Sequence, residues 1–426
     1  MRVMIVNYYY PPLIDAHAYR WEQIAQYWAK SGHQVEVITG RVHGVPDYRP
    51  ESGVHVTRVG VIARSVQTSP PASEGALGPR RQLGRIMDFL RPLYRMLYWP
   101  DSAWHWIPSL TLELLRKRGI KYDLVISYYP CMGAHLGVAA LKYFSKYPAF
   151  KWIADYGDPF ITSLRMQPNN YAVYDLLNKW IERSLARRVN FMVFTNEETA
   201  NAYRTALGID ENVRVIPHLV NIDRLYSAGF RSGSDVNSPV IIYYIGGFHK
   251  NIREPARLFD LVRGMNKGGS GKYLLKIYGA LNGFSLAELS PTDCPEIMYL
   301  GPIDRQKAIE IMRSADAIVN VDNENCIMTP SKIVECISTG RPIVNITNKG
   351  SAYPPLRTYE NSGYVMPVVE EKISDHIVIE VKYFLNKHCR AKAAPLIIVQ
   401  KSLKNHALET VANQYLELVV RAKSVF

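Results

Sequence analysis

Short apolar runs alternate with helical patterns from the start of the chain. Residues 3–8 and 35–39 are apolar runs with the length and composition of buried strands. Between them, Trp21, Ile24 and Trp28 recur at the spacing of one helix face. A strand, a helix and a second strand in this order predict a βαβ unit, in which the two strands are parallel.

The same alternation continues through both halves of the chain. We predict further strands at residues 123–128, 151–155, 191–195, 213–217, 240–245, 274–278, 297–300, 317–321 and 342–346. Helical spacing lies between most of them. The pattern predicts the α/β fold class, with two doubly wound domains.

The join between the two halves is marked by composition. Residues 228–239 are rich in glycine and serine, which is typical of a linker. We therefore place an N-terminal domain at residues 1–227, a linker at residues 228–239 and a C-terminal domain at residues 240–400. We expect residues 401–426 to form a helix that packs back on the N-terminal domain.

Composition agrees with a chain of two domains and points to anionic partners. The 426 residues are 47% hydrophobic and 21% charged, which is too long for one ordinary domain and too apolar for a disordered protein. Lysine and arginine outnumber the acids by 51 to 38, giving a net charge of +13. Such an excess favours nucleic acid, a membrane surface or phosphorylated small molecules as partners.

Cysteine spacing and hydropathy exclude other classes. The five cysteines form no C-x-x-C pair, which argues against a disulfide framework and a structural zinc site. The first apolar run is too short for a secretory signal, and no apolar stretch is long enough to span a bilayer. We expect a cytoplasmic protein.

One segment departs from the alternation. Residues 80–106 interleave five arginines with leucine, tyrosine and tryptophan: Arg80, Arg81, Arg85, Arg91 and Arg95. A basic amphipathic pattern of this kind can lie at an anionic membrane interface. It can equally form a helix that packs on the core and holds its arginines in water.

Ligands in open α/β sheets bind beyond the carboxyl ends of the strands, so residues that follow strands are the site candidates. The most informative ones begin a predicted helix, with Thr329 as N-cap and Ser331 and Lys332 in the first turn. A lysine there opposes the helix dipole, and an anion bound at the helix N-terminus would explain it. Glu335, one turn later, could accept bonds from a ribose. The alternative is a surface lysine and a solvated glutamate.

Glycines and basic residues follow the strand at 240–245. Gly246 and Gly247 would let the backbone approach a phosphate, and Lys250 and Arg253 would bring charge to it. The turn lacks a third glycine and a Walker motif, which disfavours a dinucleotide-dependent oxidoreductase and a P-loop enzyme. Tyr278 and Gly301 follow two further strands and are candidate contacts for a base.

Two carboxylates follow the strand at 151–155. Asp155 and Asp158 could orient a sugar or an acceptor hydroxyl, or take part in proton transfer. Asp158 could instead cap a following helix. His17 and His135 lie in or beside candidate loops, but a lone histidine is more often a packing or hydrogen-bonding residue.

With these residues in place, the chain resembles the retaining glycosyltransferases of family 4, including their bacterial cell-envelope members. The segments that carry the resemblance are residues 9–12 with Arg20, 32–39, 100–104, 152–159, 215–217, 221–223, 329–332 with Glu335, and 340–344. The resemblance extends over most of the chain and implies the GT-B fold, in which two Rossmann-like domains face a cleft. It also implies that the first domain is the acceptor side and that the second binds the nucleotide sugar. The segment from Thr329 to Glu335 is the most specific match.

The resemblance also implies roles. Glu335 would bind the nucleotide ribose, and Lys250 and Arg253 would neutralise the leaving diphosphate. Asp158 and Asp155 would lie beside the transferred sugar or the acceptor, and Arg20 would face the cleft from the first domain.

Three positions depart from the family pattern. The first glutamate of its E-x7-E motif is Ile327 here, the usual glycine pair after the first strand is Asp15-Ala16, and Gly157 replaces a common arginine. The histidine that many members carry near this strand end is missing.

We therefore predict a glycosyltransferase, of the hexosyltransferase type, that uses a UDP- or GDP-linked sugar with retention of configuration. We expect a lipid-linked or oligosaccharide acceptor of bacterial envelope polysaccharide synthesis, peripheral contact with the inner face of an anionic membrane, and no nucleic acid. With no D-x-D triplet, we expect no cofactor and no metal. The alternatives are a nucleotide-sugar epimerase of the same fold and a non-catalytic nucleotide-sugar-binding subunit.

Overall fold

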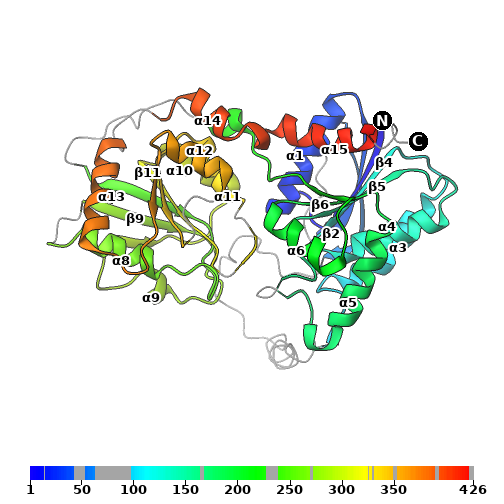
Figure 1. Cartoon of the computed structure of the whole chain (residues 1–426), viewed down its shortest axis with the longest axis horizontal. Coiled ribbons are helices and arrows are strands. Elements are labelled where there is room, and N and C mark those ends of the chain that lie inside the picture. The colour runs from blue at the N-terminus through cyan, green and yellow to red at the C-terminus, as the bar shows by residue number, and fades with distance from the viewer. Residues whose placement is uncertain are drawn as a thin grey trace, which may run out of the picture. The chain divides into compact units, whose positions relative to one another are not determined.

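The computed structural model divides into two compact units (Figure 1). The first comprises Met1–Pro217 with Ala412–Phe426, and the second comprises His218–Val411. The structure describes residues 1–13, 15–42, 53–62, 97–163, 167–226, 238–268, 272–324, 326–328, 331–348, 353–388 and 393–421. Residues 228–237 of the predicted linker and the arginine-rich segment 80–95 lie outside this set.

The first unit contains a seven-stranded sheet in which every pairing is parallel. Its strands are β1 (Arg2–Val6), β2 (Gln34–Val42), β3 (His55–Ile62), β4 (Leu124–Tyr129), β5 (Lys151–Tyr156), β6 (Phe191–Phe194) and β7 (Val213–Val215). They are ordered β3-β2-β1-β4-β5-β6-β7. The order reverses between β1 and β4, and this switch point is where doubly wound sheets bind ligands.

Helices cover both faces of this sheet (Figure 1). They are α1 (Ala16–Lys30), α3 (Ile107–Arg116) with the short turn η1 (Trp104–Trp106), α4 (Met132–Phe144), α5 (Tyr171–Ala186) and α6 (Glu197–Leu207). Helix α1 begins where the Asp15 side chain accepts the His17 N–H. It ends before Gly32, whose φ of 85° lies in the left-handed region that glycine adopts after a helix.

The second unit contains a six-stranded parallel sheet ordered β10-β9-β8-β11-β12-β13. Its strands are β8 (Val240–Ile245), β9 (Tyr273–Tyr278), β10 (Ile297–Tyr299), β11 (Ala317–Val321), β12 (Ile343–Ile346) and β13 (Val365–Val368). The switch point here lies between β8 and β11. The two parallel sheets confirm the predicted doubly wound α/β class.

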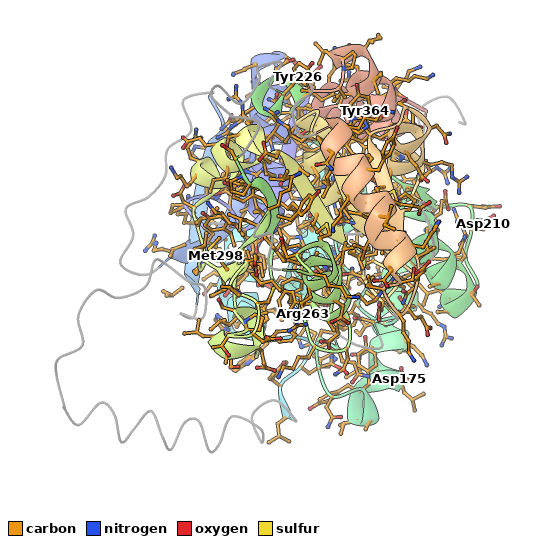
Figure 2. The ribbon with its side chains drawn as sticks, turned by 90° about the vertical axis from the view of Figure 1, so that its left-hand side faces the viewer. Asp175, Asp210, Tyr226, Arg263, Met298 and Tyr364 are labelled. Carbon is orange, nitrogen blue, oxygen red and sulfur yellow. The ribbon has the colours of Figure 1, made fainter. Side chains whose placement is uncertain are left out.

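Helices precede, connect and follow these strands. They are α7 (Ile222–Leu225), α8 (Ala256–Met265), α9 (Leu286–Leu289), α10 (Arg305–Ser314), α11 (Lys332–Ser338), α12 (Pro354–Asn361), α13 (Asp375–His388), α14 (Leu396–Ser402) with η2 (Lys404–His406), and α15 (Leu408–Arg421). Tyr226, labelled in Figure 2, follows α7 and donates its hydroxyl to the Ala394 carbonyl at 2.9 Å.

Two edge strands were not predicted. They are β3 in the first sheet and β13 in the second. Strand β13 contains Pro367, which has no N–H to donate, so the residue is tolerated at the edge position that β13 occupies. Strand β3 has exposed and half-buried positions interleaved, which weakens the apolar signal on which the prediction relied.

The last helix begins in the second unit and continues in the first, because the division falls at Ala412. The Trp28 indole of α1 donates to the Ala412 carbonyl at 3.2 Å, and the Tyr415 ring lies 5.3 Å from that of Trp21. The first unit otherwise ends at Pro217, earlier than the boundary predicted at residue 227.

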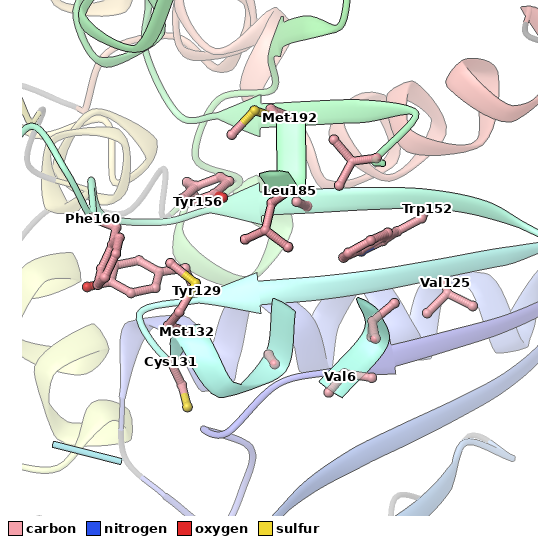
Figure 3. Close-up of a cluster of buried hydrophobic side chains, with 14 of the residues drawn as sticks. Val6, Val125, Tyr129, Cys131, Met132, Trp152, Tyr156, Phe160, Leu185 and Met192 are labelled. Carbon is pink, nitrogen blue, oxygen red and sulfur yellow. The ribbon is translucent and has the colours of Figure 1, made fainter. Parts of the chain in front are cut away.

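The core of the first unit lies against the central strands (Figure 3). Tyr129, Trp152, Tyr156 and Met192 project from β4, β5 and β6, and all are at least 97% buried. The Trp152 indole also donates to the Ser127 hydroxyl at 2.8 Å, so its one polar group is satisfied. In the part of the chain that the structure describes, none of the helices has the length and apolarity needed to cross a membrane.

Replacing Trp152 with alanine should lower the free energy of unfolding by about 3–5 kcal/mol, because a large cavity would remain. Trp104, which is 43% exposed, provides the matched control. Denaturant unfolding of Trp152→Ala and Trp104→Ala measures both. Equal losses in the two variants would contradict this account of the core.

Candidate functional site

Three glycines let the turns after β8 and β9 pack against each other. A Cβ on Gly279 would lie 2.1 Å from the Gly246 carbonyl oxygen, and one on Gly247 would lie 2.2 Å from Nδ2 of Asn282. One on Gly246 would lie 2.9 Å from Nζ of Lys332. These glycines are therefore required by close approach at the edge of the sheet.

Two cations from distant parts of the sequence meet at this turn. The Lys332 ammonium, from the first residue of α11, donates to the Ile245 carbonyl at 3.1 Å. The Arg253 guanidinium donates to Oδ1 of Asn323 at 2.6 Å and lies 3.4 Å from the Gly247 carbonyl. Asn323 follows β11, so the pair lies at the β8/β11 switch point.

The two positive charges disfavour each other. Although Lys332 is exposed as a residue, its ammonium lies in the turn, and burial lowers its pKa. The Arg253 charge lowers it further, and the Glu335 carboxylate offsets part of the effect. The pKa of His249 is also lowered, by burial and by the charges of Arg253 and Lys332. An anion bound at the turn would relieve this repulsion.

Lys250, predicted to act with Arg253, has different partners. Its ammonium lies 3.3 Å from Oε1 of Glu288 and 5.1 Å from the centre of the Phe284 ring. The structure thus brings Lys332, rather than Lys250, beside Arg253. A role for Lys250 at a diphosphate remains a prediction.

The predicted helix start is shifted. Helix α11 begins at Lys332, with Ser331 in the N-cap position and without a side-chain cap bond. Thr329, predicted as the cap, lies outside the described residues. Glu335 accepts from Arg305 at 2.6 Å, so an arginine of α10 holds its carboxylate.

The two candidate base contacts lie at adjacent strand ends. Tyr278 is half-buried, and its ring stacks with that of Tyr243 at 6.2 Å. Gly301, with φ at 83°, follows β10 and accepts the Gly279 N–H at 3.1 Å. Gly301 therefore also supports the turn after β9.

In the first unit, Arg20 and Asp155 belong to a buried network. Arg20 is 5% exposed and donates to the Tyr415 hydroxyl at 2.8 Å and to the Pro217 carbonyl at 2.8 Å. Tyr415 donates in turn to the Asp155 carboxylate, which is fully buried. Tyr415 of α15 thus contacts both side chains in this structure. The roles predicted for Arg20 at a cleft and for Asp155 beside the sugar or acceptor stay predictions.

Asp158 instead lies at the surface, with a partner that the sequence reasoning did not select. Its Oδ2 is 3.5 Å from Nε2 of His17, and Nδ1 of the same ring is 2.7 Å from the Tyr128 hydroxyl. No helix follows Asp158 directly, so capping does not explain it. A Cβ on Gly157 would lie 2.0 Å from that hydroxyl, which explains why glycine replaces arginine there.

Charge controls the state of this histidine. Burial opposes protonation, but the hydrogen bond and charge of Asp158 and the charge of Asp15 outweigh it, raising the pKa of His17 to about 9. The sequence signal for this pairing was the position of His17, two residues after Asp15 at the start of α1. His135, the other candidate, is fully buried against Ser127, and burial lowers its pKa to about 3.

Residues 16–218, just under half of the chain, match the family model of the glycosyl transferase 4-like domain. The protein is a glycosyltransferase of the GT-B fold. No curated protein matches the sequence.

Solved structures share the fold of this glycosyltransferase along its whole length. Sucrose-phosphate synthase from Thermosynechococcus elongatus matches with a TM-score of 0.65 and 14% identity, over 100% of both chains. HepE from Anabaena, in complex with UDP-glucose, matches with a TM-score of 0.59 and 12% identity, over 100% of both chains. WaaG, a glycosyltransferase involved in lipopolysaccharide biosynthesis, matches with 0.55 and 12%, over 98% of this chain and 99% of its own.

Among the described residues, no group of histidine, cysteine and acidic side chains is arranged to hold a metal ion. The expectation that the glycosyltransferase needs no metal stays a prediction.

The charge on His17 should make stability depend on pH. Its pKa of about 9 in the folded protein lies above the ordinary 6.5, so its stabilisation is complete below pH 6.5 and disappears as the pH rises through 9. Relative to His17→Gln, the wild type should lose about 1–3 kcal/mol over this interval. Unfolding measured at several pH values tests this. His376→Gln, at an exposed histidine, is the control, and parallel curves for wild type and His17→Gln would refute the assignment.

Gly279→Ala should destabilise the second unit by about 2 kcal/mol, because the added Cβ would collide with backbone that cannot move freely. Gly119→Ala is the control, since its Cβ would meet nothing within 4 Å. Denaturant unfolding compares the two. A Gly279→Ala protein as stable as Gly119→Ala would show that the turns are not tightly packed.

Proposed function

We propose that this glycosyltransferase transfers a sugar from a nucleotide-diphosphate sugar, with retention of configuration, to a lipid-linked or saccharide acceptor in bacterial envelope polysaccharide synthesis. One observation carries the donor assignment: Arg253 and Lys332 converge on the glycine turn at the β8/β11 switch point. That position is where a parallel sheet of this topology binds its ligand.

The donor site has parts suited to a nucleoside diphosphate. Cleavage of the bond between sugar and phosphate develops negative charge on the diphosphate, and fixed cations stabilise such charge strongly. Glu335, held by Arg305, offers a carboxylate oxygen to the ribose hydroxyls. The UDP-glucose complex of HepE, which has the same fold, supports a nucleotide sugar as donor.

The first unit supplies the acceptor side in this proposal. His17 and Asp158 lie at the β1/β4 switch point with polar atoms that can orient a hydroxyl group. The structural likeness to WaaG, which takes part in lipopolysaccharide biosynthesis, supports an envelope acceptor. We extend the proposal to peripheral association with the cytoplasmic membrane, where a lipid-linked acceptor would reside.

Thermal-shift measurements with UDP, GDP, ADP and their sugars test the donor class directly, because a bound ligand raises the apparent stability by mass action. We expect one nucleotide diphosphate to raise the melting temperature. Incubation with the donor alone separates a transferase from an epimerase, which would convert the donor to a new sugar without an acceptor.

Arg253→Ala and Lys250→Ala should each lower turnover by about 10²-fold, as the loss of a single group that stabilises transition-state charge does. Arg263, labelled in Figure 2, is the matched control: it projects from α8 and pairs with Asp293 at 3.1 Å. Steady-state transfer from the donor that the thermal-shift screen selects gives the comparison. Near-normal rates in both variants would contradict the assignment of the diphosphate site to this turn.

A further inference from the structure

Helix α5 has an inverted distribution of polar and apolar side chains. Val173, Leu176, Leu177 and Trp180 are exposed, by 61%, 82%, 38% and 63%. Their spacing places them along one stripe of the helix. A surface helix ordinarily turns such a stripe toward the core, so its exposure needs a partner.

The rotation of α5 is fixed by polar side chains on its inner face. Glu182 is fully buried and accepts from the Tyr156 hydroxyl at 2.7 Å. Asn178 is 1% exposed and accepts from the Trp99 indole at 2.9 Å. Turning the helix to bury the stripe would break both bonds and leave buried groups unpaired, which is costly. The stripe therefore stays outward.

Positive charge accompanies the stripe. Arg183, Arg187 and Arg188 are exposed at the C-terminal end of α5 and just beyond it. Asp175, labelled in Figure 2, lies on the same helix and pairs with Lys179 at 2.7 Å, so its charge is compensated locally. The outer face of α5 thus combines aliphatic side chains, a tryptophan and a net excess of arginine.

We propose that this stripe, Val173, Leu176, Leu177 and Trp180, is the surface by which the enzyme docks on an anionic lipid bilayer. The choice of a membrane as partner rests on the proposed function, because a lipid-linked acceptor would bring the enzyme to a membrane. The stripe belongs to α5 in the first unit, whereas the proposed donor site belongs to the second unit.

The side chains of the stripe favour a lipid bilayer as its binding partner. Tryptophan prefers the boundary between headgroups and acyl chains, because its ring is apolar and its N–H is polar. Helices that lie in this plane combine such side chains with lysine or arginine on the flank. Each arginine near an anionic surface strengthens binding by roughly fivefold. The alternative occupants are a second copy of the chain and residues 63–96 of the same chain.

Flotation with vesicles tests the proposal on the full-length protein. Vesicles of phosphatidylcholine with phosphatidylglycerol are compared with vesicles of phosphatidylcholine alone. We expect wild type to float with the anionic vesicles and Leu176→Ser/Trp180→Ser to bind them at least about tenfold more weakly. The control is Ile379→Ser/Tyr383→Ser, the same i, i+4 spacing on α13 with side chains that are 66% and 71% exposed. The control should float as wild type does.

The remaining outcomes overturn the inference. Undiminished flotation of Leu176→Ser/Trp180→Ser, or none by wild type, removes the stripe as a membrane surface. A dimeric wild type that becomes monomeric in that variant assigns the stripe to a second copy. A clear fall in the melting temperature of Leu176→Ser/Trp180→Ser would instead assign residues 63–96 of the same chain as the partner of the stripe. The thermal shift produced by nucleotides is measured on the same samples, so a failure of the donor assignment is seen separately.

Discussion

The chemistry of the second unit depends on how closely two turns approach each other at the edge of a parallel sheet. All strands of such a sheet end on the same side, so the loops that follow them share one edge. Gly246 and Gly279 bring the turns after β8 and β9 into backbone contact. With no side chain in the way, Lys332 reaches the end of β8 and Arg253 reaches the Gly247 carbonyl. These two cations repel each other, and a bound anion would relieve the repulsion.

The first unit uses polar residues in two different ways at one strand end. Asp155 lies within a buried network with Arg20 and Tyr415, and burial raises its pKa to about 6, against the opposing charge of Arg20. Asp158, only three residues later, lies at the surface beside His17. The first carboxylate holds α15 through Tyr415, and the second pairs with His17.

Buried polar groups also determine which side of α5 faces out. Burial raises the pKa of Glu182 to about 8, although its bonds with Tyr156 and Tyr203 favour the charged form. Tyr203 accepts the Phe160 N–H at 2.7 Å, so the network also holds the segment that follows Asp158. One buried carboxyl thus helps to hold the segment that follows Asp158 and keeps the apolar stripe of α5 outward.

The sequence by itself determined the fold class, because apolar runs of strand length alternate with helical spacing. Most central strands were predicted within a residue or two, and the glycine turn and Lys332 were selected from their places after strands. The edge strands β3 and β13 gave too weak an apolar pattern to be found. The burial of Arg20 and Asp155 was not predicted, because it depends on Tyr415, which lies far along the chain. Only the tertiary structure could pair His17 with Asp158, Lys332 with Arg253 and Arg305 with Glu335. Side chains so distant in sequence become neighbours only when the sheet is assembled, and local pattern contains no information about that distance.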